Sequence, residues 1–252
     1  MCIRDRFIAD KIRSRVDDPA IAEKLIPKDH GFGTKRVPME TNYYEAYNRP
    51  NVTLVDIAEA PLSHVTPTGI ATTAEHYDAD IIVYATGFDA ITGAYDRIDI
   101  EGIDGQTLRD KWRDEPVNFL GVQIAGFPNL IMVNGPTAGS ATSNFPRGIE
   151  SSVDWTTDFL KRLFDGGVTR VEASREAEIE WGAHIRDMYD LLLINQSPSW
   201  MNGYNSNVEG HEKGGRHVLY AGGLPRYRKD LEAVQAADYD GFVMETESST
   251  SA

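Results

Sequence analysis

An uninterrupted apolar run at residues 81–85, Ile-Ile-Val-Tyr-Ala, is the feature that most restricts the fold. A run this short, rich in β-branched residues, is typical of a strand buried in a parallel sheet. It ends in Thr86-Gly87, and ligands of open α/β sheets bind where strands end, at glycines that allow close backbone approach. Such turns also occur without a ligand. The run predicts a strand of a parallel sheet, as in α/β folds, and marks Thr86 and Gly87 as candidate ligand contacts.

Apolar runs and helical periodicities alternate along the rest of the chain. Further strands are expected at 51–56, 119–124, 129–133, 218–220 and 242–244, and a hairpin at 62–65 and 70–72. Helices are expected in 7–25, which holds two short ones, and at 41–49, 107–112, 149–163, 174–192 and 227–237. The tail 247–252 is small and polar, which predicts disorder.

Two of these helices carry clear apolar stripes. The first stripe consists of Ile149, Val153, Thr156, Leu160 and Leu163, and the second of Trp181, Ile185, Met188 and Leu192. The second helix also has Ser174 as its expected N-cap. Such stripes are typical of helix faces that pack into a core, so we assign neither to a functional site.

Composition excludes several classes of function. The 252 residues carry a net charge of -14, which argues against nucleic acid or an anionic membrane as the main partner. No apolar run approaches the roughly 20 residues of a membrane span, and we expect a cytoplasmic protein. A single cysteine, Cys2, and six scattered histidines provide no disulfide, redox pair or metal site. Redox chemistry would therefore need an organic cofactor.

A glycine-punctuated loop, Gly31-Phe32-Gly33-Thr34-Lys35-Arg36, ends in two adjacent cations. Glycines let the backbone turn tightly, and lysine and arginine can meet an anion as a point charge and as a planar fork. An ordinary surface loop with solvated charges would have the same sequence. The sequence gives little support to a hydrolase or a metalloenzyme, because the Gly-x-Ser-x-Gly, His-Glu-x-x-His and Walker motifs do not occur in it.

Short motifs in a fixed order add a family resemblance. They are Lys28-Asp29-His30-x-Phe32-Gly33-Thr34-Lys35-Arg36, Tyr43-Tyr44-Glu45, Asn48-Arg49-x-Asn51-Val52, Ala85-Thr86-Gly87-Phe88-Asp89-Ala90, Ala125-Gly126-Phe127-Pro128-Asn129-Leu130, Gly135-Pro136, Ser143-Asn144, Ser199-Trp200, Gly222-Gly223 and Tyr227-Arg228. In this order and spacing, the chain from about Phe7 to Met244 resembles the C-terminal half of class B flavoprotein monooxygenases of the Baeyer-Villiger type.

The resemblance implies an activity and roles for individual residues. Such enzymes use NADPH to reduce bound FAD, trap O2 as a flavin peroxide and insert one oxygen atom beside a ketone carbonyl. By position, Arg36 matches the family's catalytic arginine, and Lys35, with Thr34 beside it, matches the region near the NADP phosphate. Trp200 matches an indole that contacts the nicotinamide. Thr86 and Gly87 match the crossing between the NADP and FAD domains, and Ser143, Asn144 and Phe145 match a segment beside the flavin ring.

The chain departs from the family pattern in ways that affect its expected fold. It has no Gly-x-Gly-x-x-Gly, whereas the family carries two, and the loop 205–215 is longer and more acidic than the family's. We therefore expect a partial, Rossmann-like α/β flavoprotein whose N-terminal half is missing. The resemblance divides it into the end of a helical insertion (1–30), the C-terminal part of the NADP-binding domain (31–86), the C-terminal part of the FAD-binding domain (87–246) and a tail (247–252).

Three functional hypotheses remain open from the sequence. The first is a Baeyer-Villiger monooxygenase acting on a small ketone, of which this chain is a part that is inactive alone. The second is a related class B enzyme that oxygenates nitrogen or sulfur. The third is a non-catalytic fragment or interaction domain. The sequence leaves the oligomeric state undetermined.

Overall fold

The computed structural model describes residues 3–139 and 143–247. The chain divides into two compact units, Met1–Gly87 and Phe88–Ala252. Each unit is described by itself below.

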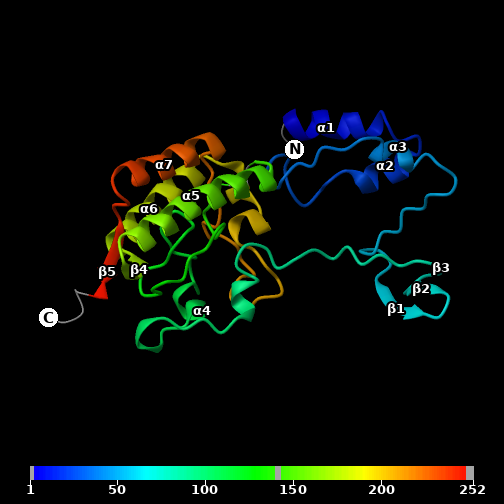
Figure 1. Cartoon of the computed structure of the whole chain (residues 1–252). Coiled ribbons are helices and arrows are strands. Elements are labelled where there is room, and N and C mark those ends of the chain that lie inside the picture. The colour runs from blue at the N-terminus through cyan, green and yellow to red at the C-terminus, as the bar shows by residue number, and fades with distance from the viewer. Residues whose placement is uncertain (1–2, 140–142, 248–252) are drawn as a thin grey trace. The chain divides into compact units, whose positions relative to one another are not determined.

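Two helices and a short third one build the core of the first unit. Helix α1 (Ile3–Arg13) packs against α2 (Pro19–Leu25), and α3 (Tyr43–Ala46) follows the cationic loop (Figure 1). A proline begins α2, and the Asp18 carboxylate caps the helix by accepting from the Ala20 backbone N–H at 2.7 Å. The buried members of this core are Ala9, Ile12, Val16, Ala22 and Ile26.

A small antiparallel sheet follows in the same unit. The predicted hairpin is confirmed as β1 (Leu62–Thr66) and β2 (Gly69–Thr72), which pair in a register that includes Val65 with Ile70. A third strand, β3 (His76–Asp78), pairs with β2 and was not predicted. These three strands form the cyan sheet of Figure 1.

Five predicted strands are wrong in this structure. Residues 51–56, 81–85, 119–124, 129–133 and 218–220 form no strand. A strand exists only when a neighbouring strand satisfies its backbone N–H and C=O groups, and within the described residues these runs have no such neighbour. In the run that most suggested a parallel sheet, Ile81 is 81% and Val83 is 80% exposed.

Helices dominate the second unit. Their bounds are α4 (Leu108–Lys111), α5 (Phe145–Asp165), α6 (Arg175–Tyr189) and α7 (Leu224–Ala236), with 3₁₀ turns η1 (Tyr95–Arg97), η2 (Ile103–Gly105), η3 (Leu193–Gln196) and η4 (Trp200–Asn202). The strand β4 (Val168–Ala173), which was not predicted, pairs antiparallel with β5 (Phe242–Thr246), which confirms the expected C-terminal strand. The predicted cap of α6 is also confirmed, since the Ser174 hydroxyl accepts from the Ala177 N–H.

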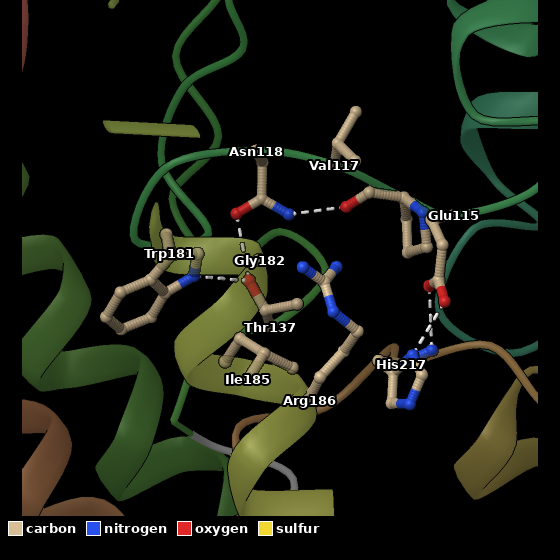
Figure 2. Close-up of a pocket in the computed structure, with 10 residues that line it drawn as sticks. Glu115, Val117, Asn118, Thr137, Trp181, Gly182, Ile185, Arg186 and His217 are labelled. Atoms are coloured by element: carbon tan, nitrogen blue, oxygen red, sulfur yellow. Dashed lines mark hydrogen bonds and ion pairs between the residues drawn. The ribbon is translucent and has the colours of Figure 1, made fainter. Parts of the chain in front are cut away.

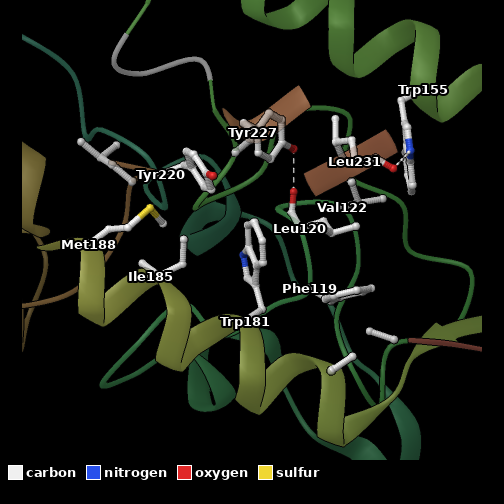
Figure 3. Packing of buried hydrophobic residues seen from close by; sticks show 14 of the residues in the cluster. Phe119, Leu120, Val122, Trp155, Trp181, Ile185, Met188, Tyr220, Tyr227 and Leu231 are labelled. Carbon is white, nitrogen blue, oxygen red and sulfur yellow. Dashed lines mark hydrogen bonds between the residues drawn. The ribbon is translucent and has the colours of Figure 1, made fainter. Parts of the chain in front are cut away.

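The main core of the second unit lies among α5, α6 and α7 (Figures 1 and 3). The stripe predicted for α6 is confirmed at Trp181, Ile185 and Met188, which are buried and face Tyr220 and Tyr227 (Figure 3). Its fourth member, Leu192, lies beyond the end of the helix and is half-buried. Two polar atoms of this core find backbone partners. The Tyr227 hydroxyl donates to the Leu120 carbonyl at 2.6 Å, and the Trp155 indole N–H donates to the Leu231 carbonyl at 3.0 Å.

The stripe predicted for α5 is mostly wrong. Ile149 and Val153 are 38% and 44% exposed, whereas Trp155 and Phe159 are buried. Helical periodicity is compatible with two adjacent faces here, and the face with the two large rings removes more apolar surface from water.

In the part of the chain that the structure describes, no helix is both long and apolar enough to span a bilayer.

Candidate functional site

The candidate residues fall in two different units. Thr34, Lys35, Arg36, Thr86 and Gly87 belong to Met1–Gly87, and the remaining four belong to Phe88–Ala252, namely Ser143, Asn144, Phe145 and Trp200. Within each unit, the candidates that lie near one another are those adjacent in sequence, namely residues 34–36 of the cationic loop and residues 143–145. Each group has a geometry of its own.

The cationic loop is shaped by its own backbone and by α1. Gly33 has φ of 86°, in the left-handed region that favours glycine. The buried Thr34 donates from its hydroxyl to the Gly31 carbonyl at 2.8 Å. The Asp5 carboxylate accepts from the Phe32 N–H at 2.9 Å, which ties the loop to α1. Thr34 thus serves to hold the turn that presents the two cations.

Asp29, which lies within one of the sequence motifs but was given no role there, is a partner of the loop. Its carboxylate lies 2.7 Å from the His30 Nδ1 and accepts from the Lys35 Nζ at 3.2 Å. The His30 imidazole, and after it the Lys35 ammonium, hold the pKa of the Asp29 carboxyl at about 2. Lys35 therefore faces a carboxylate at neutral pH, while Arg36 is exposed beside it.

A pocket of about 510 Å³ adjoins these cations within the first unit. Ile8 and Ile12 of α1, Phe32 of the loop and Tyr44 of α3 contribute apolar and aromatic walls. Lys35 and Arg36 also line it. The volume falls in the range of small-molecule sites, roughly 300–1,000 Å³. Sequence reasoning did not find this pocket, although the adjacent Tyr43 and Tyr44 were part of the motif that pointed to the region.

Thr86 and Gly87 lie at the end of the first unit, in a segment without helix or strand. Gly87 has φ of 90°, and a Cβ placed on it would meet no atom within 4 Å. The residue therefore needs its glycine for conformation rather than for space. The structure does not bring Thr86 or Gly87 into the pocket beside Lys35 and Arg36.

Residues Ser143 and Asn144 directly precede helix α5, which begins at Phe145. The Asn144 side chain accepts from the Arg147 N–H at 3.3 Å and caps the helix, while Pro146 occupies its first turn. Phe145 is half-buried against the main core. Asn144 thus has a structural role that is independent of any ligand.

Trp200 sits on a turn that is held by a buried amide. Asn202 donates to the carbonyls of Ile194 at 3.1 Å and Ser197 at 3.0 Å, and it accepts from the Ser199 N–H at 3.0 Å. Ser199 in turn caps the 3₁₀ turn η4. The indole of Trp200 is half-buried and packs on the core. A single asparagine therefore fixes the position of the candidate aromatic contact.

The loop that leads to 143–145 is anchored by a buried polar network (Figure 2). The Thr137 hydroxyl donates to Asn118 Oδ1 at 2.9 Å and accepts from the Trp181 indole N–H at 2.9 Å. Asn118 Oδ1 also accepts from the Gly121 N–H at 2.7 Å. The pocket beside this network measures about 20 Å³, the size of about one water molecule. It is therefore a packing feature of the loop and too small for a cofactor.

Charged groups elsewhere in the second unit form pairs rather than a metal site. Among residues 3–139 and 143–247, no three His, Cys, Asp or Glu side chains are arranged to hold a metal ion. His217 is paired with Glu115 at 2.6 Å, and Arg216 is buried with its guanidinium on the carbonyls of Trp112 and Asp114. These groups are fully engaged in tying loops together.

Known proteins resemble the chain over nearly its whole length. It is 45% identical over 236 residues to the 2-oxo-Delta(3)-4,5,5-trimethylcyclopentenylacetyl-CoA monooxygenase of Pseudomonas putida, covering 94% of this chain and 43% of that protein. It is 40% identical to the phenazine N-monooxygenase PhzNO1 of Lysobacter antibioticus, covering 97% of this chain and 44% of that protein. The chain thus spans less than half the length of these relatives. No protein-family model matches it.

A solved structure shows the same relationship in three dimensions. The crystal structure of OTEMO in complex with FAD and NADP superimposes with a TM-score of 0.82 at 44% identity. The match covers 96% of this chain and 44% of that one. The prediction of a partial α/β fold is therefore confirmed.

Proposed function

We propose that this chain, a homologue of the C-terminal part of Baeyer-Villiger flavin monooxygenases, belongs to an enzyme that uses FAD, NADPH and O2 to insert one oxygen atom beside a ketone carbonyl. The family resemblance predicted from the short motifs is confirmed, and so is the expectation that the chain corresponds to part of such an enzyme. The observation that carries the proposal is 45% identity across 94% of the chain. The proposed reaction is that of the whole enzyme.

Arg36 is the residue to which we assign catalysis. An arginine guanidinium stays charged in proteins and offers several N–H donors in one plane. In a site that excludes water, such a fixed cation stabilises negative charge that develops during the reaction. Lys35, positioned by Asp29 at 3.2 Å, is assigned to the phosphate of the nicotinamide cofactor. Two adjacent cations on a glycine turn fit an anionic group of this kind.

The remaining candidate residues are assigned to cofactor contacts in the assembled enzyme. When bound, FAD supplies the reducible ring and NADPH supplies the hydride. We assign Thr86 and Gly87 to the crossing between the two cofactor domains, Ser143 to Phe145 to the side of the flavin ring, and Trp200 to the nicotinamide. The buried amide of Asn202 holds the turn of Trp200, which limits the reorganisation needed when the cofactor binds.

The same proposal divides the chain by cofactor. Residues 1–30 would be the end of a helical insertion, 31–86 would belong to the NADP-binding domain and 87–246 to the FAD-binding domain. The glycine fingerprints that hold pyrophosphates do not occur in this chain, and the proposal assigns them to the part of the enzyme that the chain does not cover. We place the enzyme in the cytoplasm, where NADPH is supplied.

The test uses a complete enzyme. The upstream half of the Pseudomonas putida relative is joined to this chain, and NADPH oxidation is followed with cyclic ketones, with ester products identified by mass spectrometry. Ketone-dependent oxidation with ester formation supports the proposal. Arg36→Ala is expected to lower kcat by about 100-fold or more. Arg4→Ala, which removes an exposed arginine of α1 outside the pocket, is expected to keep full activity. Full oxygenation by Arg36→Ala would refute the catalytic assignment.

A second reaction class is favoured by one relative. PhzNO1, at 40% identity, is a phenazine N-monooxygenase, so oxygenation of a ring nitrogen is our alternative proposal. The same chimera is assayed with phenazines and with sulfides. Productive turnover of these substrates with none on ketones would select the alternative. The third hypothesis, a non-catalytic domain, requires that neither assay gives product with the chimera.

A further inference from the structure

We propose that the 510 Å³ pocket of the first unit binds an amphiphilic carboxylate, with its apolar chain between α1 and the segment 25–44 and its head group at Lys35 and Arg36. The ligand class is a medium-chain aliphatic carboxylic acid in its ionised form. The proposal shares Lys35 and Arg36 with the proposed oxidation but does not rest on it, because the titration below uses the chain without any cofactor.

The interior of the pocket is suited to an apolar chain. Ile8 and Ile12 of α1, Leu25 at the end of α2, and Phe32 and Tyr44 line it. Ile12 is 2% exposed and belongs to the core of the unit, and Ile8, Leu25 and Tyr44 pack against that core. Burying apolar surface contributes roughly 25 cal/mol per Å², and a chain of several methylenes gains from every contact with these walls.

The rim of the pocket is suited to an anionic head. Lys35 and Arg36 both line it, and an arginine fork can bind a carboxylate with two parallel hydrogen bonds. The ion pair of Lys35 with Asp29 is a surface pair, since the Asp29 side chain is 72% exposed, and such pairs are weak. An incoming carboxylate can therefore share the Lys35 ammonium at little cost.

The acidic residues of the rim are already engaged and do not oppose this anion. The Asp5 carboxylate accepts from the Phe32 N–H at 2.9 Å. Glu40 pairs with Arg15 at 2.5 Å and accepts from the Tyr43 N–H at 2.8 Å. A cationic ligand would have to displace these partners, so the charge of the rim favours a carboxylate.

Isothermal titration calorimetry of the 252-residue chain with three probes measures how much the carboxylate head and the apolar tail each contribute to the affinity. Decanoate carries both, decan-1-ol only the tail and acetate only the head. Decanoate is expected to bind with one-to-one stoichiometry, decan-1-ol at least about tenfold more weakly, and acetate without measurable heat. Equal binding of decanoate and decan-1-ol would overturn the role of the cations. Absence of decanoate binding would overturn the proposal.

Three variants assign the binding to this pocket. Lys35→Gln removes one head-group contact, and Val37→Asp adds a negative charge to the pocket lining at a site that is 49% exposed and therefore tolerant of a polar residue. Both are expected to weaken decanoate binding by about tenfold, with an unchanged circular dichroism spectrum. Lys28→Gln, which removes the same charge outside the pocket lining, is the matched control and is expected to bind normally. An equal loss in Lys28→Gln would show non-specific charge attraction and overturn the proposal.

Discussion

At the scale of single residues, Asp29 controls the charge around the cationic loop. Its carboxylate contacts both His30 and Lys35, although most of the Asp29 side chain is exposed. These contacts exist only while the carboxyl is ionised. The contribution of Asp29 is therefore complete above its ordinary pKa of 3.8 and is lost as the pH falls through about 2, the pKa in the folded chain.

We predict that the Asp29 carboxyl titrates near pH 2. The reason is that protonation must break its hydrogen bonds to His30 and Lys35. Carbon-detected NMR of the carboxyl resonances between pH 1.5 and 6 measures this directly, and Asp29→Asn identifies the resonance. A midpoint near 3.8 for Asp29 would contradict the prediction.

Asn144 caps helix α5 in the structure and is also one of the proposed flavin contacts. Its side chain caps α5, and replacing an asparagine cap by alanine typically costs about 1 kcal/mol. We predict that Asn144→Ala lowers the free energy of unfolding of the second unit by about this amount, and that Asn144→Asp, which keeps an acceptor, does not. Urea unfolding followed by tryptophan fluorescence reports this unit alone, because all four tryptophans lie in it. Equal stability of the two variants would refute the capping role.

At the scale of elements, α5 shows how packing selects one face of a helix. Phe159 is fully buried, with ring centroids 5.3 Å from Trp155 and 4.6 Å from Phe242. Phe164, five residues later on the same helix, is 79% exposed. The two phenylalanines have equal chemistry and helix propensity, so any difference between them measures tertiary packing.

We predict that Phe159→Ala destabilises the second unit by about 3 to 5 kcal/mol, because it removes a buried ring and leaves a cavity. Phe164→Ala is the matched control and is expected to change stability by less than about 0.5 kcal/mol. Tryptophan fluorescence during urea unfolding measures both. Similar values for the two variants would contradict the burial of Phe159 and the exposure of Phe164.

At the scale of the whole molecule, two compact units are joined in a segment that forms no helix or strand. Tyr84 is 73% and Phe88 is 100% exposed in this segment. Proteases cleave exposed segments without regular structure first. The boundary between the units is therefore accessible to cleavage.

We predict that limited chymotrypsin digestion cleaves first after Tyr84 or Phe88 and releases the two units as stable products. Mass spectrometry of the early products measures the sites. Trypsin is the control, because no lysine or arginine lies between Arg49 and Arg97, and it cannot cut this segment. First cleavage by chymotrypsin inside α5 or α6 would contradict the division into two units.

The sequence by itself determined the family relationship, the hairpin of β1 and β2, the main helices and the cap of α6. These depend on residue order, on local periodicity and on contacts within a few residues, all of which can be seen in one chain. It also predicted two cations on a glycine turn, and the structure has that turn with Gly33 at φ of 86°.

Only the tertiary structure decided which apolar runs became strands and what surrounds the cations. Residues 81–85 read as a buried strand, yet Ile81 and Val83 are exposed because a strand needs a partner that lies far away in sequence. For the same reason the local pattern could not predict β4 pairing with β5, the face of α5 that is buried, or the apolar pocket that α1 builds beside Lys35 and Arg36. Each of these is set by contacts between segments distant in sequence, and a local pattern contains no information about those contacts.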